Sequence, residues 1–190
     1  MEADRLAREQ SIPILYMVMV PQVEGLARLR NGQLSEAISL LRRAIESWNR
    51  LGGYNRVPYL KSALAEALAL EGDLDAGLHL IDESLEQVER PGWEERIHYA
   101  EILRLKGWML SLKGDFEGAE KNYLVSLDWA RQQQAKSWEL RTATSLARLW
   151  QGQGKRKKAH ELLAPIYGWF TEGFDTKDLK EAKALQSELA

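Results

Sequence analysis

Apolar and polar residues recur along the chain with the period of amphipathic helices, and short polar turns interrupt them at regular intervals. Four turns contain a glycine, and these glycines are 40, 42 and 40 residues apart. A small residue stands seven positions before and five after each glycine, and mostly large apolar residues stand nine and thirteen positions after it. Around the third turn these positions hold Gly107, Gly114, Ala119, Tyr123 and Leu127. The pattern predicts four helical hairpins of one design.

Each position has a physical role in such a hairpin. Glycine ends the first helix because the left-handed turn conformation is costly for other residues. Small residues let the two antiparallel helices approach closely, while the large residues, four positions apart, share one helical face. A single hairpin cannot bury its apolar face, so copies must stack. We therefore expect an all-α fold, a right-handed α-solenoid of about four hairpins in one domain over residues 1–190.

The same pattern sets the expected boundaries. The repeats cover residues 12–51, 54–90, 93–133 and 136–171. Their helices are expected over 13–31, 34–51, 56–71, 74–89, 93–113, 116–133, 136–152 and 156–171. A final helix over 177–189, with an N-cap at Asp175 or Thr176, is expected to cap the array. Residues 1–10 resemble the end of a second repeat helix, so we interpret them as the remnant of a preceding helix.

These small, glycine and large positions resemble the tetratricopeptide repeat over nearly the whole chain, although each repeat here exceeds the usual length of about 34 residues. A closer resemblance rests on EILRLKGWML (101–110), ARQQQAKSWELRTATSLARLW (130–150) and LLAPIYGWFTEGFDTKDLKEAKAL (162–185). These stretches look like the C-terminal end of bacterial signalling proteins in which a cyclase or DNA-binding domain and a STAND-type ATPase precede a tetratricopeptide array. The resemblance implies a regulatory or sensor role in signal transduction, without the cyclase or ATPase residues.

Composition narrows the chemistry. Cysteine is absent, and the histidines His79, His98 and His160 fall in three different repeats, so neither a metal site nor a cofactor is expected. The net charge of −2 argues against nucleic acid as a partner, and the basic run 154–158 is interpreted as a solvated turn. The acidic start of the chain and the lack of a long apolar run argue against a leader and a membrane span, and favour the cytoplasm. No arrangement of catalytic residues is found, so an enzyme is not expected.

The repeat register places one set of side chains on the inner, concave surface. This candidate partner-binding set comprises Tyr59, Glu66, Glu101, Arg104, Trp108, Arg141, Thr144 and Arg148. An aromatic ring among three arginines can bind a peptide that carries a carboxylate, because guanidinium and carboxylate groups pair through two hydrogen bonds. The alternative is that Glu101 pairs with Arg104 or Arg141 and that the groove is only solvated.

These features predict a protein–protein interaction or regulatory sensor module that binds a protein or a peptide. An acidic partner would suit the arginine-lined groove. A small-molecule receptor with its inducer inside the superhelix and a subunit needed only for assembly are the alternatives.

Most tryptophans, Trp169 included, are expected to pack between helices. The run 12–21 is apolar on every side, which predicts either a homodimer through the N-terminal helix or residues 1–10 folded back over it.

Overall fold

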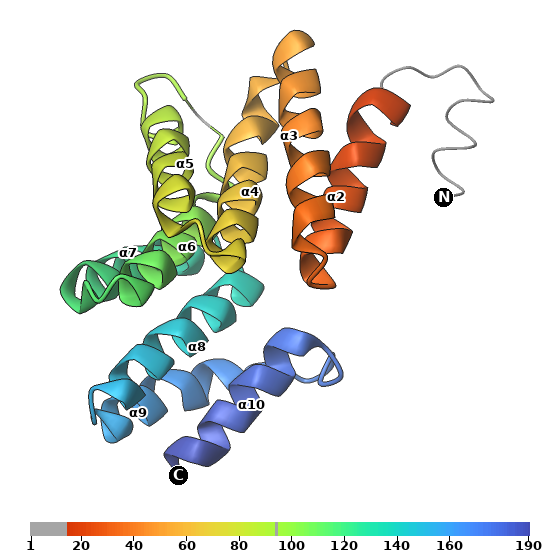
Figure 1. The fold of residues 1–190 in the computed structure, drawn as a ribbon. Helices are drawn as coiled ribbons and strands as arrows, with labels where there is room; N and C mark the ends of the chain where they lie inside the picture. Colours follow the sequence, from red (N-terminus) through yellow and green to blue (C-terminus); the bar gives the residue numbers. More distant parts are fainter. Residues whose placement is uncertain (1–14, 94) are drawn as a thin grey trace. The chain divides into compact units, whose positions relative to one another are not determined.

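The computed structural model describes residues 15–93 and 95–190, and these residues form a series of helices joined by short turns (Figure 1). Helices make up 79% of this described part, and no strand occurs within it. The prediction of an all-α fold of helical hairpins is confirmed. The chain divides between residues 96 and 97 into two compact units, each described by itself. The single continuous domain stays a prediction.

The first unit contains two stacked hairpins. The first joins α2 (Val20–Arg30) to α3 (Leu34–Arg50), and the second joins α4 (Val57–Glu71) to α5 (Leu74–Val88). Two short turns precede them, the π-helical η1 (Leu15–Met19) and the 3-10 turn η2 (Tyr54–Arg56). Because α3 also packs against α4, the two hairpins share an apolar core that includes Leu29, Leu41, Leu60, Leu64 and Leu68.

The second unit has two hairpins and one further helix. They are α6 (Tyr99–Leu112) with α7 (Phe116–Gln132), α8 (Lys136–Gly152) with α9 (Arg156–Tyr167), and α10 (Lys177–Leu189). Helix α7 packs against α8, and α10 packs against both α8 and α9. One face of α10 is buried, with Leu179, Ala182, Leu185 and Leu189 on it. The helix expected over 177–189 is therefore present with the expected bounds.

The turn glycines and the close helix crossings follow the sequence pattern. Gly72 ends α4 with a φ of 109°, a left-handed conformation that side chains disfavour, and the other three turn glycines have the same sign of φ. At Gly107, an added Cβ atom would lie 2.8 Å from two ring carbons of Tyr123. At Gly25 it would lie 3.0 Å from Leu41. In both hairpins the small residue makes room for the large residue that follows the turn.

Three expected boundaries are wrong, each for a local reason. The helix expected from residue 93 begins at Tyr99, because the Trp93 indole donates a hydrogen bond to the backbone oxygen of Glu95 (2.7 Å) within a turn. Helix α9 ends at Tyr167 rather than at 171, because the next backbone N–H groups, those of Trp169 and Phe170, donate to the residues three positions before them instead of four. Trp169 consequently lies beyond the helix and is 58% exposed, contrary to its expected packing.

The third difference concerns the first helix. Residues 15–19 form the turn η1, and α2 begins at Val20, with Pro21 in its first turn where no backbone donor is needed. Val18 is fully buried whereas Met17 is 40% exposed, so this stretch is covered on one side only. The remnant helix expected over residues 1–10 lies outside the described residues.

Two buried polar contacts join helices within the second unit. The Ser126 hydroxyl on α7 donates to the Ala100 backbone oxygen on α6 (2.6 Å) and shares a 2.8 Å hydrogen bond with Thr142 on α8. The buried Glu139 carboxylate accepts from Lys136 (2.7 Å) and Arg131 (3.0 Å). Burial opposes ionisation of Glu139, but these cationic donors outweigh it and lower its pKa below 4.5.

Candidate functional site

The expected partner-binding residues divide between the two units. Tyr59 and Glu66 lie on α4 of the first unit, and both are half-buried. The other six lie on α6 and α8 of the second unit, whose helices pack against each other. The candidate site is built from these six residues together with their neighbours in the second unit.

Two of the three arginines share one buried carboxylate. Arg104 donates from Nε and Nη2 to the two oxygens of Glu101, both at 2.8 Å. Arg141, on the neighbouring helix, lies with its Nη2 atom 2.9 Å from the Glu101 Oε1 atom. The Glu101 side chain is only 4% exposed, so this ion-pair cluster is largely shielded from solvent. Glu101 thus pairs with both arginines, and the three-arginine clamp expected from the sequence is not free to act as one.

Arg141 is held from further directions as well. Its Nε atom lies 3.9 Å from an Asp178 oxygen on α10, and its guanidinium lies over the Trp138 ring, 5.4 Å from the ring centre. Thr144, on the same helix, is buried and donates its hydroxyl to the Leu140 backbone oxygen (2.8 Å). The Arg141 charge is therefore already balanced by carboxylates of the protein, and the Thr144 hydroxyl proton is already donated.

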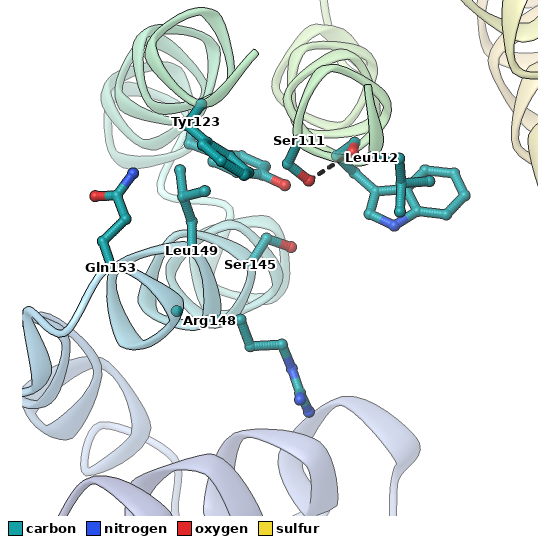
Figure 2. Close-up of a pocket in the computed structure, with 10 residues that line it drawn as sticks. Ser111, Leu112, Tyr123, Ser145, Arg148, Leu149 and Gln153 are labelled. Carbon is teal, nitrogen blue, oxygen red and sulfur yellow. Dashed lines mark hydrogen bonds between the residues drawn. The ribbon is translucent and has the colours of Figure 1, made fainter. Parts of the chain in front are cut away.

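Trp108 and Arg148 lie at a pocket between α6, α7 and α8 (Figure 2). The pocket has a volume of about 380 Å³. Its lining residues are Trp108, Ser111, Leu112, Phe116, Tyr123, Ser145, Arg148, Leu149, Gly152 and Gln153. Trp108 is half-buried and Arg148 is exposed. Figure 2 shows the Arg148 side chain extending away from the Tyr123 ring.

The pocket is apolar with a single charge. Burial raises the pKa of Tyr123 to about 12, although the Arg104 charge and a hydrogen bond with Ser111 act against this, so the phenol is neutral at physiological pH. The hydroxyl protons of Ser111 and Ser145 are donated to the backbone oxygens of Trp108 (2.7 Å) and Arg141 (3.0 Å). Within the part of the chain that the structure describes, no carboxylate pairs with Arg148. Arg148 is the charged group that a ligand of this pocket would meet.

Sequence reasoning missed the apolar wall of the pocket. Leu112 and Phe116 flank the Gly114 turn and are 55% and 51% exposed. The sequence could have indicated these two residues, because large apolar residues on both sides of a polar turn stay exposed unless another element covers them. The residues predicted for the concave surface of this unit lie on the faces of α6 and α8, whereas Leu112 and Phe116 lie at helix ends.

The basic turn and the possible metal-binding side chains form no further candidate site in the described residues. Lys155 and Lys158 lie 3.8 Å and 3.2 Å from the Glu120 carboxylate, and Lys158 also lies over the Trp150 ring. The basic run of this turn is thus partly neutralised by the protein itself. Among the described residues, no group of histidine and acidic side chains gathers where it could hold a metal ion. No helix in the same described ranges has the length and apolar character needed to cross a membrane.

Solved structures share this fold. The crystal structure of BtubC (BKLC) from P. vanneervenii aligns with a TM-score of 0.71 and 19% identity, over 99% of this chain and 84% of that chain. The crystal structure of the Podosopora anserina putative kinesin light chain nearly identical TPR-like repeats aligns with a TM-score of 0.63 and 15% identity, over 100% and 87%. No protein-family model and no curated protein matches the chain. The likeness establishes a tetratricopeptide-like repeat fold.

Proposed function

We propose that the chain is a non-catalytic protein-interaction module that binds a peptide segment of its partner along α6 and α8. The observation that carries this proposal is that Trp108 and Arg148, a cation with no paired carboxylate among the described residues, line one pocket on neighbouring helices. Aromatic and arginine side chains contribute disproportionately to the binding energy of protein interfaces. The exposed apolar side chains of Leu112 and Phe116 extend the same surface.

The charge distribution favours a partner with one acidic residue near an apolar one. Glu101 and, at Arg141, also Asp178 offset the charges of the two arginines, and this cluster is largely shielded from solvent. Arg148 is exposed and can pair with a carboxylate at little desolvation cost. A highly acidic segment would find few free cations here. Tyr59 and Glu66 would extend the surface if the repeats continue as one solenoid, which is part of the proposal.

The proposed biological setting is bacterial signalling in the cytoplasm. Its support is the resemblance of residues 101–110, 130–150 and 162–185 to the C-terminal arrays of cyclase–ATPase proteins, where a repeat array acts as regulator or sensor. In that setting, partner binding to the repeat surface would control an output carried by other domains.

Selection from a random peptide library tests the interaction. The wild-type chain should enrich peptides that bind Trp108→Ala and Arg148→Glu at least about tenfold more weakly, because each change removes a main contact. Lys121→Glu is the matched control, since Lys121 is exposed on α7 and does not line the pocket. Failure to enrich any peptide, or enriched peptides that bind all variants equally, would contradict the proposal.

We also propose self-association through the N-terminal helix. Its support is the apolar edge on which Met17 and Val23 are 40% and 56% exposed, since exposed apolar side chains favour association. Light scattering coupled to size exclusion should give a dimer mass that the double change Met17→Glu and Val23→Glu converts to a monomer mass. A monomer mass for the wild type at tens of micromolar would refute the dimer.

A further inference from the structure

The pocket between α6, α7 and α8 also has the features of a small-molecule site. Its volume of about 380 Å³ falls in the lower part of the range of about 300–1,000 Å³ that such sites occupy. Three helices wall it, and its lining is dominated by Trp108, Leu112, Phe116, Tyr123 and Leu149. An apolar cavity with few polar groups is the usual composition of a small-molecule site. The ligand it selects is then set by those few polar groups.

The polar groups at the pocket favour an anion with one charge. Arg148 is the one cation among the described lining residues, and none of them is acidic. The Tyr123 phenol stays neutral because its pKa is about 12. The nearby guanidinium groups of Arg104 and Arg141 are bound to Glu101, so a second negative charge would find no free partner there. A ligand with one carboxylate and an apolar body matches both the Arg148 guanidinium and the apolar lining of the pocket.

We infer that this pocket binds a free, small hydrophobic carboxylic acid, with its apolar body against Trp108 and Leu112 and its carboxylate on Arg148. The ligand site goes beyond the proposed partner binding and does not depend on it. Its regulatory consequence does rest on the proposed function: an acid in the pocket occupies both Trp108 and Arg148, so it excludes a peptide from the same two side chains.

Titration of the full chain with 3-phenylpropionate tests the assignment. Calorimetry gives the affinity, and proton–nitrogen NMR spectra follow the Trp108 indole and the Arg148 side chain. We expect both signals to shift, and we expect 3-phenylpropionamide, which lacks the charge, to bind at least about tenfold more weakly. Arg148→Gln should lose at least about tenfold for the acid while keeping the affinity for the amide. Lys121→Gln, which removes one exposed charge outside the pocket, should bind both probes as the wild type does.

The outcomes separate the possible errors. Equal binding of acid and amide would refute the role of the carboxylate, and shifts confined to residues outside the pocket would refute the site. If the tripeptide acetyl-Ala-Ala-Phe, with a free C-terminus, bound more than about tenfold tighter than 3-phenylpropionate, the occupant would be a peptide end rather than a free acid. The peptide selection described above is independent of this titration. A chain that binds the acid but enriches no peptide would keep the ligand site and lose the proposed partner function.

Discussion

Replacement of Gly107 by alanine tests the close crossing of α6 and α7. Carbon atoms in contact prefer about 3.5–4.0 Å, whereas the new Cβ would lie 2.8 Å from two ring carbons of Tyr123 and 3.1 Å from the Ala119 backbone oxygen. The ring is only 2% exposed, so it cannot move aside without disturbing the core. Overpacking of this kind costs about 1–3 kcal/mol, and alanine returns about 1 kcal/mol through its helix propensity. We expect a net loss of up to about 2 kcal/mol.

Urea unfolding followed by far-UV circular dichroism measures this loss. Gly152→Ala is the matched control, because Gly152 is also helical and nothing lies within 4 Å of an added Cβ atom there. The control should be neutral or stabilised by up to about 1 kcal/mol. In a Tyr123→Ala background the clash with the ring is removed and only the 3.1 Å contact with the Ala119 backbone oxygen remains, so Gly107→Ala should become nearly neutral. Equal effects of the two glycine substitutions in the wild-type background would refute the crossing geometry.

Three further substitutions test the buried polar contacts, all by urea unfolding. Glu101→Gln leaves two shielded guanidinium groups without their carboxylate and should cost about 3 kcal/mol, against at most about 1 kcal/mol for Glu46→Gln in an exposed pair. Thr142→Val keeps the shape but removes a hydrogen bond to the buried Ser126, and should cost about 1 kcal/mol. Because folding lowers the pKa of Glu139 from 4.5, its ionised form stabilises the fold above that pH, and the contribution disappears as the pH falls through the folded pKa. Glu139→Gln should therefore destabilise the protein near neutral pH and progressively less in acid.

The hairpin fold could be predicted because its determinants are local in sequence. The spacing between Gly107, the Gly114 turn and Tyr123 is repeated in every hairpin, and each spacing corresponds to one contact between successive helices. Boundaries failed where local hydrogen bonds override the periodic pattern. The Trp93 indole holds its turn through a hydrogen bond to the backbone, and after α9 the Trp169 and Phe170 backbone groups donate three residues back instead of four. Periodicity contains no information about either effect.

The site was predictable only in part. Glu101, Arg104 and Arg141 are brought together as expected from the alignment of successive repeats. How the carboxylate is shared depends on side-chain packing across two helices, which spacing does not determine. Asp178 belongs to α10, outside the repeat pattern, so its approach to Arg141 had no signal in the sequence. The apolar wall of the pocket likewise depends on how three helix ends meet.

The sharing of one carboxylate by two guanidinium groups constrains how this protein can evolve. A single change at Glu101 removes the carboxylate that Arg104 and Arg141 share in a shielded position. A change at either arginine still leaves the carboxylate one arginine partner. Descendants that lose the glutamate should therefore already have replaced at least one of the two arginines. Across homologous sequences, Glu101 should be the least variable of the three positions, and its rare replacements should coincide with the loss of at least one of the two arginines.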